Sequence, residues 1–211
     1  MAAMEDVLEV YAEPYDSSRQ KGNGEETQKP RITETRVPRP AQPGQPQRCD
    51  DADERNGTRP RLLCVEPQAG RRHVHGTEPR TTLDFAYDMP WLVDEGDPEA
   101  SVIRVGLDHL NTHKMASWYE ACEPAEARRI ARKLECHSTP KHGSWLNMAA
   151  IELRVLQQQG LDRRIPDADM LQHAIAIWEH QRNAEQATID WRFSIADARK
   201  KLERLYPSLP S

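Results

Sequence analysis

Two stretches near the middle of the chain decide the fold: VIRVGLD at residues 102–108 and HSTPKHGSWLNMAA at residues 137–150. The first is a short apolar run that ends on Asp108, which predicts a buried strand with a carboxylate at its carboxyl end. The second predicts a strand, a polar turn through Pro140 and Gly143, and a helix opened by Ser144. Because open α/β sheets place their sites at the carboxyl ends of strands, we expect an acidic site beside this helix.

Hydrophobic periodicity predicts further elements on both sides of this region. These are a strand at residues 61–66 in a hairpin with residues 71–75, a short strand at residues 134–137, and helices at residues 4–15, 81–92, 124–134, 144–160, 167–183 and from Ser194. The order of strands and helices indicates an α/β domain with a helical C-terminal region.

Composition limits the class of protein. The chain has 211 residues, of which 30% are charged, and this length suits one domain. The net charge of −5 argues against a protein whose whole surface binds DNA. Basic residues are nevertheless concentrated in one part of the sequence, at Arg128, Arg129, Arg132, Lys133, Lys141, Arg154, Arg163 and Arg164. A solvated helix face explains this clustering as well as a local DNA-binding face does.

Neither a membrane span nor a disulfide framework is predicted. No apolar run approaches the roughly 20 residues that a membrane helix needs. The four cysteines have no CxxC spacing and follow no secretory leader, so free thiols are expected. The predicted location is therefore cytoplasmic.

Several blocks of the sequence resemble the signature motifs of a known family. They are LDHLNTH (residues 107–113), PKHGSWLN (140–147), ETRVP (34–38), RNGT (55–58), LDRRIPD (161–167) and DWRF (190–193). In these blocks the chain is similar to bacterial insertion-sequence transposases related to mariner, which carry a DDE superfamily endonuclease domain. The resemblance covers nearly the whole chain, and it implies an RNase H-like fold with a mixed sheet flanked by helices.

The region before residue 59 departs from the family pattern. The resemblance assigns the first, central strand of the sheet to the stretch that contains QKGNGEETQKPR (residues 20–31), which has no Val, Ile, Leu, Phe or Met. A central strand normally reads as a nearly continuous apolar run, and glycine weakens strands further. We therefore expect residues 1–58 to be a poorly ordered leader with a degraded first strand, and residues 59–211 to be the endonuclease domain.

The resemblance implies a site built from an Asp, a second Asp and a Glu. Such carboxylates hold two Mg²⁺ or Mn²⁺ ions about 3.5–4 Å apart, which activate the attacking oxygen and stabilise the leaving oxygen. Asp108 matches the second Asp, although a carboxylate that only makes a turn is the alternative. Glu25 replaces the first Asp, and Ala150 stands where the family has Glu. Glu152 is no easy substitute, because two residues turn a helix by about 200°.

Other polar residues match family motif positions near this site. The resemblance assigns them supporting roles or contacts with DNA phosphates, and they are Asn111, His113, Lys141, His142 and Asn147.

Two other groups of residues have competing interpretations. His73 and His75 share one strand face and could bind a metal, but two ligands alone favour a solvated hairpin edge. Trp145, Trp178 and Trp191 are expected to pack in a core or a hinge rather than to stack on bases.

The resemblance implies the catalytic half of an insertion-sequence transposase, which cuts DNA and transfers strands during transposition and integration. Ala150 and Glu25 predict that this copy is degenerate or truncated and inactive. DNA at transposon ends and target sites is the implied partner, with a homodimer as an open option and no membrane. The family's helix-turn-helix region has no counterpart before Val7, so a fragment or the second product of a split element is expected. The alternative is a non-catalytic protein of the same fold that binds DNA or an intact transposase.

Overall fold

The computed structural model describes residues 1–34, 53–76, 89–96, 98–108 and 115–206. Five strands form one sheet in the order β3–β2–β1–β4–β5. They are β1 (Arg19–Glu34), β2 (Asp53–Glu66), β3 (Arg71–Gly76), β4 (Val102–Leu107) and β5 (Leu134–Ser138). β1, β2 and β3 are antiparallel neighbours, whereas β4 runs parallel to β1 and β5 runs parallel to β4. The predicted mixed sheet and the predicted hairpin are confirmed.

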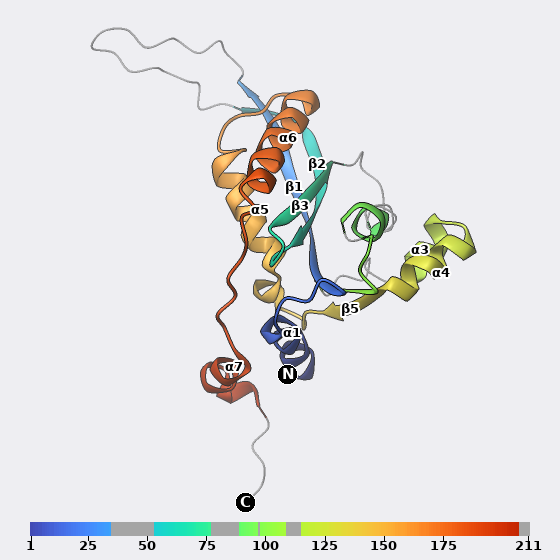
Figure 1. The fold of residues 1–211 in the computed structure, drawn as a ribbon. Helices are drawn as coiled ribbons and strands as arrows, with labels where there is room; N and C mark the ends of the chain where they lie inside the picture. Colours follow the sequence, from blue (N-terminus) through green and yellow to red (C-terminus); the bar gives the residue numbers. More distant parts are fainter. Residues whose placement is uncertain (35–52, 77–88, 97, 109–114, 207–211) are drawn as a thin grey trace, which may run out of the picture.

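Helices cover both faces of the sheet (Figure 1). They are α1 (Ala2–Ala12), α3 (Met115–Ala121), α4 (Pro124–Lys133), α5 (Met148–Gln159), α6 (Ala168–Ala184) and α7 (Ile195–Lys201), with shorter turns at Leu92–Gly96, Ser144–Leu146 and Glu203–Leu205. α5 and α6 lie on one side of the sheet, and α3 and α4 lie on the other (Figure 1). Most of the helix predicted at residues 81–92 falls outside the described residues. None of the helices in the described ranges is long and apolar enough to cross a membrane.

Alternation along β2 supplies both layers of the core. Leu62 and Cys64 belong to the cluster under α3 and α4, while Leu63 and Val65 belong to the cluster under α5 and α6. Successive side chains of a strand point to opposite faces, so one apolar strand serves two cores. A third cluster joins α1 to the start of α5 and to α7.

β1 lies in the middle of the sheet, which corrects the expectation of a degraded first strand. Lys21 pairs with Arg104 of β4, and Asn23 pairs with Val65 of β2. The strand is polar yet buried, since Lys21 is 4% exposed and Asn23 is 1% exposed. The boundary expected at residue 58 falls within β2.

The polar side chains of β1 are stabilised by the segment that precedes the strand. Asn23 Nδ2 donates to the Tyr11 hydroxyl at 2.5 Å, and Lys21 Nζ donates to the carbonyl oxygens of Glu13 and Pro14. Burial raises the pKa of Tyr11 to about 12 and lowers the pKa of Lys21 from its ordinary value. At Gly22 a Cβ atom would come 3.1 Å from a methyl group of Leu92, so the missing side chain lets the opposite layer approach.

Candidate active site

Two carboxylates directly follow the last residue pair between β1 and β4. Gly24 of β1 pairs with Leu107 of β4, and the next residue on each strand is acidic, Glu25 on β1 and Asp108 after β4. Residues that follow a paired position on parallel strands remain neighbours, so both carboxylates lie beside the carboxyl end of β4. Each of the two residues is half-buried. The structure therefore brings together the two acidic residues that the sequence singled out.

A short loop is fixed at its ends to these two carboxylates. At its start, Thr139 donates from its amide to the Leu107 carbonyl at 2.8 Å and from its hydroxyl to Asp108 Oδ1 at 3.0 Å. At its end, Asn147 Nδ2 donates to Glu25 Oε2 at 2.7 Å. We call residues 140–146, between these two anchors, the site loop. Its position is set by the same two groups that form the candidate site.

Asn147 has both ends of its amide occupied within the protein. Besides Glu25, Nδ2 donates to the Gly24 carbonyl at 2.7 Å, and Oδ1 accepts from the Ala149 amide at 3.1 Å and caps α5. Its side chain is fully buried. The prediction that Ser144 caps the helix is wrong, because Ser144 begins the short turn before α5 and the N-cap of α5 is Asn147. In this arrangement Asn147 orients Glu25 and does not face the solvent.

Residue 150, to which the resemblance assigns a third carboxylate, is an alanine. Ala150 lies half-buried in the first turn of α5. Glu152 is 1% exposed, with Oε1 accepting from Arg182 at 2.7 Å and Oε2 lying 3.1 Å from Nε of Arg72. It is therefore held against β3 and α6, in agreement with the prediction that it is no substitute. The described residues contain no group of three or more His, Cys, Asp or Glu placed to hold a metal ion.

Some of the residues predicted to contact DNA phosphates are exposed, and others lie outside the described residues. Lys141 and His142 are exposed on the site loop, and His142 has a left-handed backbone with φ of 65°. Asn111 and His113 lie outside the described residues. The contact of Thr139 with Asp108 was not predicted from the sequence. The signal for it was the strand end itself, because Thr139 directly follows β5, the parallel neighbour of β4.

Internal contacts occupy part of the basic cluster. Arg129 donates to both carboxylate oxygens of Asp94 and to Glu126, and Lys133 Nζ donates to the Val93 carbonyl at 2.9 Å. His73 likewise contacts Glu179 at 3.2 Å and stacks on the ring of Trp91. These basic residues and this histidine are used for packing within the domain.

The three tryptophans that were predicted to pack in a core or a hinge differ in their exposure. Trp178 is 4% exposed in the core, and Trp191 packs edge-on against Tyr11, as predicted. Trp145 differs from the prediction, because it is 49% exposed on the site loop. Its ring contacts Phe193 edge-on, with the centroids 5.4 Å apart.

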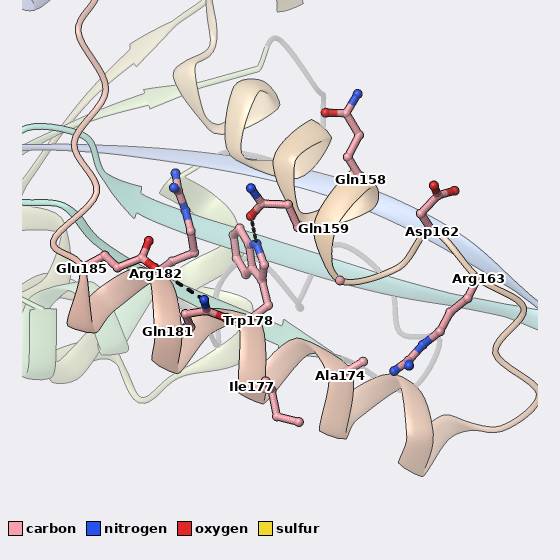
Figure 2. A pocket seen from close by; sticks show the side chains of 11 residues that line it. Gln158, Gln159, Asp162, Arg163, Ala174, Ile177, Trp178, Gln181, Arg182 and Glu185 are labelled. Atoms are coloured by element: carbon pink, nitrogen blue, oxygen red, sulfur yellow. Dashed lines mark hydrogen bonds between the residues drawn. The ribbon is translucent and has the colours of Figure 1, made fainter.

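A cavity of about 760 Å³ lies at the other end of α5, against α6 (Figure 2). Trp178 closes one side of it and donates from Nε1 to Gln159 at 3.2 Å. Arg182 also lines it, with its guanidinium directed to Glu152. The cavity is separate from the carboxylates, because α5 has 12 residues and so extends about 18 Å between its two ends.

Comparison with known proteins identifies a matching family model and similar solved structures. The family model described as DDE superfamily endonuclease matches residues 26–172. No curated protein sequence matches the chain. Among solved structures, the chain is similar to the Mos1 mariner paired-end complex with Mn, with a TM-score of 0.56, 13% identity, and coverage of 88% of this chain and 55% of that one. It is also similar to the left-end paired-end complex of Mos1 transposase, with a TM-score of 0.55, 15% identity, and coverage of 88% and 56%.

These likenesses confirm the predicted fold. A mixed five-stranded sheet flanked by helices matches the RNase H-like transposase fold of Mos1. The chain spans about half the length of the solved chains that it matches.

Proposed function

Because the chain belongs to the DDE superfamily endonuclease family, we propose that it is the catalytic-fold domain of a transposase and that it binds DNA at the edge of the sheet that carries Asp108 and Glu25. We further propose that it does not cleave DNA as it stands. The observation that carries the proposal is the site loop, which is anchored to Asp108 through Thr139 and to Glu25 through Asn147. A loop fixed in this way presents Lys141 and His142 beside the two carboxylates, where a phosphate backbone would have to lie.

Among the described residues, the side chains at this site do not fit a pair of divalent cations. Carboxylate oxygens are the ligands that Mg²⁺ and Mn²⁺ prefer, and Asp108 and Glu25 provide them from neighbouring strands. Each already accepts a hydrogen bond, and Ala150 offers no oxygen from its side chain. Mg²⁺ needs near-octahedral geometry and usually keeps several waters, so two carboxylates alone hold it loosely. This deficit supports an inactive copy.

The source and partners follow from the resemblance. The sequence blocks at residues 107–113 and 140–147 support a bacterial insertion sequence related to mariner. The solved structures of Mos1 include paired-end and strand-transfer complexes, and they support DNA at transposon ends and targets as the partner of this chain. A homodimer belongs to the same proposal.

A nicking assay on supercoiled plasmid in Mg²⁺ and in Mn²⁺ tests the proposal. We expect no cleavage by the natural chain, and faint cleavage by Ala150→Glu combined with Glu25→Asp. Removal of one electrostatic group from such a site commonly costs about 10²–10³ in rate, and two positions are altered here. Cleavage by the natural chain that disappears in Asp108→Ala would overturn the proposed inactivity.

The alternative is a domain that binds an intact transposase rather than DNA. The retained sheet and C-terminal helices support it equally, because protein binding needs no carboxylates. The two are separated by DNA binding at low salt, which the transposase-type proposal requires and the alternative does not.

A further inference from the structure

Trp145 is held in place and yet half open to solvent. Its ring meets Phe193 edge-on, with an angle of 79° between the ring planes, and the residue keeps 49% of its surface exposed. Lys201 Nζ lies 5.3 Å from the centroid of the Phe193 ring. By contrast, Trp118 in the core is 0% exposed. An aromatic ring that is braced on one side and open on the other is a surface on which a flat ligand can stack.

This surface is close to the candidate active site. Trp145 is two residues before Asn147, so their Cα atoms are at most about 7 Å apart. Asn147 in turn bonds to Glu25. The other end of the site loop is fixed to Asp108 through Thr139. Any strand that runs along the two carboxylates therefore passes within reach of Trp145.

The charges around Trp145 favour an anionic ligand. Lys141 and His142 are exposed on the same loop, and Lys200 and Lys201 are exposed at the end of α7. Exposed aromatic rings combined with a basic surface are the features by which proteins bind single-stranded nucleic acid, whose bases stack while its phosphates pair with cations. An acidic peptide would use the charges but not the flat ring.

We propose that Trp145, braced by Phe193, whose own ring is contacted by Lys201, is a stacking site for an unpaired base of a DNA strand. This inference rests on the proposed function, because that function brings DNA to the carboxylate edge. The site takes an unpaired base, because the bases inside a duplex are already stacked on both faces.

Binding of three labelled ligands to the full chain at low salt tests the site. The ligands are an oligothymidine, an abasic strand of the same length, and a duplex of the same length. We expect the native chain to bind the oligothymidine about 10-fold more tightly than the abasic strand, since stacking of one base has about that effect. Trp145→Ala should lose this preference, and Trp145→Phe should keep most of it. Tyr119→Ala is the matched control, because Tyr119 is a similarly exposed aromatic residue, 47% exposed on α3.

The outcomes separate this inference from the proposed function. Two results would refute the stacking site while leaving DNA binding intact. In the first, the native chain binds the abasic strand as tightly as the oligothymidine. In the second, Trp145→Ala is folded by circular dichroism and keeps the native preference for the oligothymidine. If Trp145→Ala fails to fold, the affinities of Trp145→Phe decide the matter. This variant should still bind the oligothymidine more tightly than the abasic strand, and equal affinities for the two refute the stacking site. If the native chain binds none of the three ligands, both proposals fail.

Discussion

A single amide group, that of Asn147, joins three parts of the molecule. Its oxygen caps α5, and its nitrogen donates to the Gly24 carbonyl and to Glu25. The side chain is fully buried, so water cannot replace these partners. The helix start, the central strand and one acidic group of the candidate site are therefore positioned together.

Asn147→Ala should lower the free energy of unfolding by about 2–4 kcal/mol. Loss of an N-cap costs about 1 kcal/mol, and buried groups left without a hydrogen-bond partner cost about 1–3 kcal/mol more. Urea denaturation followed by circular dichroism measures this. Ser144→Ala is the matched control, because Ser144 is exposed and is not the N-cap of α5, so its loss should change stability by less than about 0.5 kcal/mol. Equal effects of the two substitutions would contradict the role given to Asn147.

At the scale of elements, β1 is the strand that the sequence described least well. The predictions at β4 and β2 were correct because VIRVGL at residues 102–107 and LLCV at residues 62–65 are apolar runs. β3 was predicted from the clear turn that precedes it at residues 67–70. The residues that stabilise β1, such as Tyr11 and Glu13, precede the strand, and a count of apolar residues within the strand does not include them. Asp108 was predictable from the end of its strand. The bonds from Thr139 and Asn147 were not, because they depend on the path of the site loop.

Hydrogen exchange tests the place of β1 and the boundary expected at residue 58. Amides of residues 21–24 should exchange slowly, because β1 is hydrogen-bonded to β2 on one side and to β4 on the other. Exchange of the first residues of α1 provides the internal comparison, since helix ends open more readily. Rapid exchange across residues 21–24, as fast as at the start of α1, would restore the interpretation of a poorly ordered leader.

A buried ion pair connects β3 to α5 and predicts a second effect at this scale. Arg72 is 0% exposed and its Nε lies 3.1 Å from Glu152, which is 1% exposed. Glu152→Ala leaves a buried guanidinium without its carboxylate, so the free energy of unfolding should fall by about 3–5 kcal/mol. Glu126→Ala removes an exposed partner of Arg129 and should cost less than about 1 kcal/mol. Thermal melts of the two variants, each compared with the native chain, measure the difference, and similar losses would count against the buried pair.

For the whole molecule, net charge determines what kind of DNA binding the proposed function predicts. A net charge of −5 leaves only local basic surfaces, and part of the basic cluster is used internally by Arg129 and Lys133. Binding of duplex DNA should therefore be weak, independent of sequence and strongly dependent on salt. Three phosphate contacts would weaken it about 40-fold between 50 and 200 mM salt.

Fluorescence anisotropy over a salt series measures this dependence. Lys141→Ala should lower the slope of log affinity against log salt by about one unit, because Lys141 is exposed on the site loop. Lys133→Ala should lower it less, since Lys133 donates to carbonyl oxygens. Affinity that is unchanged across the series, or no binding even at the lowest salt, would exclude the proposed mode.

Under the proposed function, the hydrogen bond between Asn147 and Glu25 also restricts the mutational route to an active site. Glu25→Asp shortens the side chain by one carbon–carbon bond of about 1.5 Å and withdraws its oxygen from a contact of 2.7 Å. Ala150 takes part in none of the three side-chain hydrogen bonds of Asn147, so a glutamate there leaves them in place. Glu25→Asp alone therefore lowers stability without adding a metal ligand. After Ala150→Glu, the same change is expected to increase cleavage activity. The two positions should show sign epistasis, which means that Glu25→Asp is harmful alone and beneficial after Ala150→Glu. The order that avoids a harmful step begins with Ala150→Glu.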